Sequence, residues 1–129
     1  MTVALVLAGV AGSIAAATHV GMFVVESLLF GRDGTRRMLE VPDAHAPAVR
    51  LWAFHQGVYN LLLGSIGAAG VVALALGAST VARTLLLAAG AAMVAAALAL
   101  LAVDRRRERV PGFVAQALPA LVCIVAISA

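Results

Sequence analysis

The stretch Val81–Val103, VARTLLLAAGAAMVAAALALLAV, decides the fold class of this protein. It contains one charged residue, Arg83, and its apolar residues do not alternate with polar ones. About 20 apolar residues are needed for a helix to cross the hydrocarbon core of a bilayer. Strands of a membrane barrel are shorter and alternate in polarity. The stretch is therefore predicted to be a transmembrane helix.

Three further apolar segments flank this one in the 129-residue chain. Hydrophobic residues make up 64% of the chain and charged residues 12%, against about half and a quarter in soluble domains. The prediction is an all-α integral membrane four-helix bundle, one domain over residues 1–129. The N-terminal segment lacks a positively charged start and continues through Phe30, so we expect a retained span rather than a cleaved signal. The expected spans are residues 3–30, 51–77, 81–103 and 112–128.

Arginine placement predicts the orientation of the spans. The nine basic residues are all arginine, and eight of them lie in the first and third connections. By the positive-inside rule these connections face the cytoplasm, so both termini are extracytoplasmic. The absence of lysine and the abundance of alanine, glycine and arginine indicate a bacterial source, and hence a multi-pass protein of the bacterial cytoplasmic membrane.

Smaller features predict details of the packing. TRRMLEV in the first connection is expected to form an interfacial helix, with Met38, Leu39 and Val41 towards the bilayer. Small residues in the second and third spans allow close helix approach. Cys123 is interpreted as a small packing residue, and Pro119 is a candidate kink in the fourth span.

The second span carries polar and aromatic residues at helical spacing i, i+3, i+4, i+7 and i+8, which places them on one stripe. Lipid cannot satisfy polar groups, so we expect this stripe to turn towards the protein interior. Its members are Trp52, His55, Gln56, Tyr59 and Asn60.

Titratable groups in the first span complete the candidate site. His19 and Glu26 are seven residues apart, nearly in line on an α-helix. Gln116 in the fourth span is expected at the depth of Glu26 and His55, four residues from the cytoplasmic end of its span, and His19 is expected deeper, near the midplane. These groups are expected to share one pocket in the cytoplasmic half of the bundle. Glu26 is either a proton-transferring group or a structural anchor bonded to Tyr59 or Gln116. His19 and His55 are the candidate proton partners.

Several site types are excluded or disfavoured by the motifs. Two imidazoles and a carboxylate would suit zinc or iron, but their spacing forms no recognised motif, so we predict neither metal nor cofactor. The sequence has no basic patch with interleaved aromatic residues, so we expect no nucleic-acid partner. The expected partners are the lipid bilayer and a small lipophilic molecule, and a homo-oligomer is compatible with the sequence.

Three motifs resemble a family of small bacterial four-span membrane proteins, domain of unknown function 1304. They are THVGMFVVESLLF at 18–30, HQGVYNLLLG at 55–64 and QALPAL at 116–121. The resemblance implies the four-span architecture and marks motif positions in all three stretches. The chain departs from the family at His55, where asparagine is usual.

Together these features favour a cofactor-independent enzyme acting on a small lipophilic molecule, of the isomerase, epoxide-opening or cyclase type. Glu26 is its predicted acid or base, with His19 or His55 as partner. The predicted substrate-binding residues are Trp52, Gln56, Tyr59, Asn60 and Gln116. A proton-coupled transporter of hydrophobic compounds and a structural or accessory membrane subunit are the alternatives.

Overall fold

The computed structural model describes residues 2–129, and within them every regular element is helical. Four helices are long and apolar enough to cross a membrane, which confirms the predicted fold class. The first is α1, continued without a break by a π-helical turn, η1. A short helix, α2, lies in the first connection. The bounds are α1 Val3–Phe23, η1 Val24–Leu28, α2 Asp33–Met38, α3 Ala46–Ala75, α4 Ser79–Val103 and α5 Val110–Ser128.

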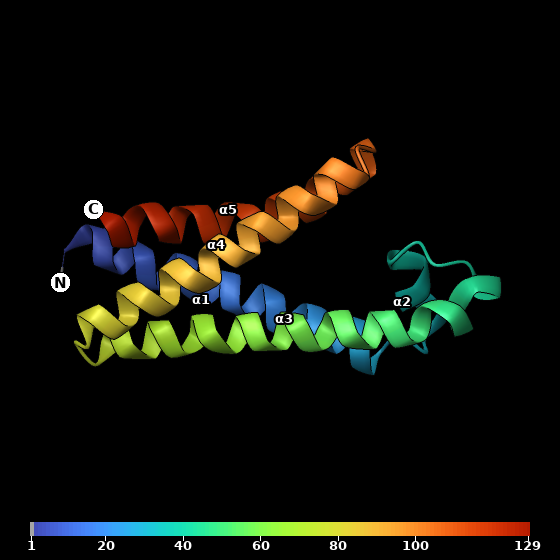
Figure 1. Ribbon diagram of the computed structural model, residues 1–129, viewed down its shortest axis with the longest axis horizontal. Coiled ribbons are helices and arrows are strands. Elements are labelled where there is room, and N and C mark those ends of the chain that lie inside the picture. Colours follow the sequence, from blue (N-terminus) through green and yellow to red (C-terminus); the bar gives the residue numbers. More distant parts are fainter. Residues whose placement is uncertain (1) are drawn as a thin grey trace.

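The four long helices form an up-and-down bundle (Figure 1). Helix α1 packs against α3 and α5, and α4 packs against the same two helices, so α1 and α4 lie diagonally opposite. Both termini lie at one end of the bundle, and α2 lies at the other. Helix α3 begins at Ala46, before the apolar segment that starts at Leu51, and therefore extends beyond the predicted span at the α2 end.

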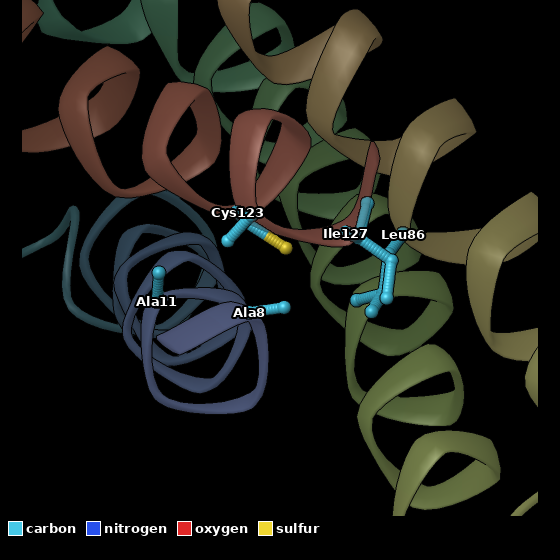
Figure 2. Close-up of a cluster of buried hydrophobic side chains, with 6 residues drawn as sticks. Ala8, Ala11, Leu86, Cys123 and Ile127 are labelled. Carbon is cyan, nitrogen blue, oxygen red and sulfur yellow. The ribbon is translucent and has the colours of Figure 1, made fainter. Parts of the chain in front are cut away.

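Small side chains dominate the core at the end that holds the termini. Ala8 and Ala11 of α1 face Cys123 of α5, beside Leu86 and Ile127 (Figure 2). Cys123 is buried among apolar neighbours, in agreement with its interpretation as a packing residue.

Glycines let α1 and α3 approach closely, as the small-residue pattern predicted. A methyl group on Gly64 would lie 2.9 Å from the carbonyl oxygen of Ala16 and 2.9 Å from a methyl carbon of Val20. Only glycine leaves room for this backbone contact. The α1–α3 crossing therefore depends on a residue without a Cβ atom.

The two arginine-rich connections lie at the same end of the bundle and are joined by ion pairs. Glu40 contacts Arg106 at 3.0 Å and Arg109 at 2.9 Å. Asp104 accepts hydrogen bonds from both arginines, and these bonds hold the pKa of Asp104 well below its usual range, the Arg106 bond first. The remaining arginine, Arg83, lies near Ser128 at the opposite end. This separation agrees with the predicted grouping of the charges.

The first connection forms a short helix, as expected, but α2 covers Asp33–Met38 and leaves Leu39 and Val41 of the predicted segment outside it. Arg36 anchors this helix. Its guanidinium donates to Asp33, to Asp43 at 3.0 Å and to the carbonyl oxygen of Gly31 at 2.6 Å. Met38 is exposed, whereas Leu39 and Val41 are half-buried and line a groove against α3. Leu39 and Val41 thus contribute to a concave surface that the sequence did not predict.

Candidate functional site

Glu26 lies in the π-helical turn η1, at the end of the first span. A π-helical turn contains one more residue than an α-helical turn, and such turns are frequent at functional sites. The next residue, Ser27, donates its hydroxyl to the carbonyl oxygen of Phe54 at 3.0 Å. A Cβ atom at Gly57 would collide with the Ser27 hydroxyl. The turn is therefore seated directly on the backbone of α3.

Asn60 holds the carboxylate of Glu26. Its Nδ2 donates to Oε2 of Glu26 at 2.8 Å, and Asn60 itself is 4% exposed. The sequence had offered Tyr59 or Gln116 as the partner, and the structure provides Asn60 instead. Within residues 2–129 no hydrogen bond to Oε1 of Glu26 is present, and that oxygen is not buried. One carboxylate oxygen is thus fixed and the other is accessible.

His19 and Gln116 form a second polar pair, between α1 and α5. His19 is fully buried, with Nδ1 2.9 Å from the carbonyl oxygen of Ala15 and Nε2 3.2 Å from Nε2 of Gln116. A carbonyl oxygen only accepts, so Nδ1 carries the proton, and neutral Nε2 accepts from the amide of Gln116. Both ring nitrogens are occupied by protein groups.

Two open grooves meet at Glu26 and Phe30, one on each flank of α3. The first, here called the aromatic groove, has a volume of about 590 Å³ and contains Trp52, His55, Gln56 and Tyr59 together with Leu39 and Val41. The second, here called the Arg50 groove, has a volume of about 540 Å³ and contains Ser27, Leu28, Arg50, Leu51 and Phe54. Both volumes are in the range of pockets that hold one small molecule.

The stripe on α3 does not turn into the bundle as a whole, so that part of the prediction is wrong. Asn60 alone is buried; Trp52 is 71% exposed, Tyr59 is 62% exposed, and His55 and Gln56 are exposed. The buried face of α3 is centred instead on Gly57, Asn60, Gly64, Gly67 and Gly70. Glycine permits the closest helix approach, so the bulky residues are displaced to the neighbouring face. There they line the aromatic groove with Glu26.

The expectation that His19, Glu26 and His55 share one chamber is also wrong. His19 lies deeper, sealed against Gln116, while Glu26 and His55 line the aromatic groove. Among residues 2–129 no three His, Cys, Asp or Glu side chains are grouped to hold a metal ion. His19 lies in the α-helical part of the first span and Glu26 in the π-helical turn, so the two positions do not belong to one regular α-helix.

Other groove residues were not identified from the sequence as parts of a site. Arg50 had been used only to predict topology, and Phe30 and Phe54 had been assigned to the apolar spans. A weak signal was available: Arg50, Phe54 and Gly57 follow one another at helical spacing on α3. Such spacing does not reveal that η1 packs beside them.

Comparison with known proteins agrees with the architecture. The family described as protein of unknown function (DUF1304) matches residues 13–128, so the chain belongs to this family. No curated protein and no solved structure matches the chain. The family description assigns no activity.

Proposed function

We propose that this member of the DUF1304 family binds a small lipophilic molecule beside Glu26 and transforms it by acid–base chemistry without a cofactor. The observation that carries the proposal is the asymmetric environment of the Glu26 carboxylate. Asn60 fixes Oε2 at 2.8 Å, while Glu26 borders two grooves of ligand size. A carboxylate with one restrained and one accessible oxygen is well suited to proton transfer.

The neighbours of Glu26 supply the other functions that such a reaction needs. His55 lines the same groove, and an imidazole can both accept and donate a proton, so it can exchange a proton with the substrate or with water. Gln56 and Tyr59 offer N–H and O–H donors to an oxygen that gains negative charge in the transition state. Trp52 offers an apolar face to the substrate. His19 is a positioning residue, because both of its ring nitrogens are engaged.

Three reaction types fit these groups. In an isomerisation, Glu26 removes a proton from a carbon beside a carbonyl and returns it to another carbon. In an epoxide opening, an acid protonates the epoxide oxygen while water or a group of the substrate attacks carbon. Cyclisation is the internal form of that attack. Each reaction balances without an oxidant or a reductant.

The purified protein in neutral nanodiscs can test this with a β,γ-unsaturated steroid ketone and a lipophilic terminal epoxide. Loss of a positioned acid or base costs about 10²–10⁴-fold in rate, and Glu26→Gln is expected to reduce kcat by that factor. Asn60→Ala is expected to reduce kcat less, because the carboxylate remains but is no longer oriented. Glu108→Gln, at an exposed glutamate, is the matched control. Turnover that survives Glu26→Gln unchanged would exclude the mechanism.

The packing away from the site favours an enzyme over a transporter. Beyond the grooves, the centre of the bundle encloses a cavity of only about 10 Å³ among Gly12, Ala15, Met93 and their neighbours, space for at most one water. A conduit would need this packing to open. Proteoliposomes in a pH gradient test the alternative: hydrophobic cations accumulated in a Glu26-dependent way would replace the enzymatic proposal by transport.

A further inference from the structure

Arg50 is an available cation at the edge of the Arg50 groove. It is exposed, and among residues 2–129 no carboxylate forms an ion pair with it. Of the other loop arginines, Arg36, Arg106 and Arg109 are paired. The remaining ones also lack a carboxylate partner among residues 2–129 but do not line this groove; they are Arg32, Arg37, Arg105 and Arg107. Arg50 is also the one basic residue among those that line the groove. Its charge is therefore free to bind an anion.

Apolar side chains lie directly beside this cation. Leu51 and Phe54 of α3 and Leu28 of η1 line the same groove, and they are 64%, 48% and 62% exposed. Arg50 stands where the apolar segment of α3 begins, with Phe54 one helical turn further into the span. The groove thus has a charged end towards the loops and an apolar continuation towards the membrane interior.

Glu26 lies deeper along α3 than Arg50. It is tied to Asn60, ten residues beyond Arg50, which is a rise of roughly 15 Å along the helix. Its neighbour Ser27 is tied to Phe54, between the two. A molecule anchored at Arg50 and extended along the groove would therefore present part of its chain, rather than its head group, to Glu26.

From this arrangement we propose that the substrate is a single-chain amphiphile with an acidic head group, bound by Arg50, and an apolar chain that passes Glu26. The inference rests on the proposed function, because it takes the Arg50 groove as the approach to the reacting carboxylate. A guanidinium binds a carboxylate or phosphate through two parallel hydrogen bonds. This arrangement also keeps the acidic head group away from the carboxylate of Glu26, which would repel it.

Oleate and oleyl alcohol, which share a chain and differ in the head group, test the role of Arg50. Binding to the full-length protein in neutral detergent is measured by native mass spectrometry. Oleate is expected to bind about tenfold more tightly than the alcohol. Arg50→Gln is expected to remove this preference and to leave alcohol binding within twofold. Arg105→Gln, at an exposed arginine outside the groove, is the matched control and should keep it. Equal binding of acid and alcohol to the wild type would overturn the proposal, as would a preference that survives Arg50→Gln.

The direction of the chain can be tested with the single tryptophan, Trp52, which lies two residues from Arg50, about 3 Å along α3, and lines the aromatic groove. Bromine quenches tryptophan fluorescence at short range. With 2,3- and 9,10-dibromostearate at equal occupancy, the 2,3 compound is expected to quench Trp52 more strongly, because its bromines lie beside the head group at the depth of Arg50, whereas the 9,10 bromines lie deeper, towards Glu26. Stronger quenching by the 9,10 compound would place the middle of the chain, and not the head group, at the depth of Trp52 and contradict the assignment of Arg50.

These measurements separate the two proposals. Glu26→Gln is expected to abolish turnover and to retain the preference for oleate, whereas Arg50→Gln is expected to raise KM for an acidic substrate with kcat nearly unchanged. A head-group preference that depends on Arg50, in a protein whose turnover ignores Glu26, would uphold the binding site and reject the catalytic role. Binding of phosphatidylglycerol alone, without oleate, would reject the single-chain ligand.

Discussion

The two ends of the bundle are built from different residues, and the difference locates the site. At the end with the termini, alanine and glycine fill the core, and Ala8, Ala82 and Ala120 are completely buried. At the α2 end the helices carry His19, Glu26, Asn60 and Gln116, and grooves open beside α3. One end is a packed scaffold, and at the other polar side chains lie between the helices beside open grooves.

This contrast follows from what each end can do with its side chains. Small residues bring backbones into contact, which leaves an interior cavity of only about 10 Å³; the groove of about 480 Å³ on the surface between α1 and α5 is lined by apolar residues alone. Polar groups in a membrane must find partners, and Asn60 and Gln116 provide them for Glu26 and His19. Both ring nitrogens of His19 are used, whereas the Asn60 bond uses only one carboxylate oxygen of Glu26. The second carboxylate oxygen of Glu26 remains available beside the grooves. This available oxygen distinguishes a functional site from polar contacts that only hold helices together.

The largest effect on stability is expected at Gly64, within the close α1–α3 contact. Gly64→Ala places a methyl group 2.9 Å from the backbone oxygen of Ala16, which cannot move independently. Overpacking of this kind costs about 1–3 kcal/mol. Unfolding in mixed detergent micelles measures the loss. Gly21→Ala, where no atom lies within 4 Å of the added carbon, should be neutral or stabilising; equal losses at both glycines would refute the close contact.

A smaller loss of stability is expected at Gly57, but with a larger effect on the site. Gly57→Ala meets the hydroxyl of Ser27, a flexible group, and also lies 3.2 Å from the Ser27 backbone nitrogen. Rotation of the hydroxyl would break its bond to Phe54, at a cost of about 1 kcal/mol. We expect activity to fall more than stability, because Glu26 is displaced with the turn. The Gly57→Ala/Ser27→Ala double variant should recover part of the lost stability and part of the lost activity. Strictly additive losses would argue against the contact between Gly57 and the Ser27 hydroxyl.

The smallest effect is expected in the loop cluster around Asp104. Hydrogen bonds from Arg106 and Arg109 lower the pKa of Asp104 in the folded protein. Its contribution to stability is therefore complete above the ordinary carboxyl pKa, about 3.9, and is lost as the pH falls below that value towards the folded pKa. Asp104→Asn should lower the Tm slightly at pH 6 and leave it unchanged at the acid limit. A Tm difference between Asp104→Asn and the wild type that grows as the pH falls would contradict a lowered pKa of Asp104 in the folded protein.

Much of the fold could be read from the sequence because lipid imposes severe constraints. Unbroken apolar runs such as Val81–Val103 must form helices, and the clustering of arginines correctly grouped the first and third connections. The site was predicted only in part. The grouping of Glu26 with the Trp52–Tyr59 region was correct at the level of the groove, but the inward orientation of that stripe and the inclusion of His19 were wrong.

The sequence by itself determined four membrane-length helices, their small-residue packing and the presence of polar groups within the spans, because these follow from composition and local spacing. The tertiary structure decided which polar groups meet. The close contact at Gly57 and Gly64 fixed the rotation of α3, and the π-helical turn set the register of Glu26. Both depend on backbone contacts between separate helices, and such contacts leave no periodic signal in either segment alone.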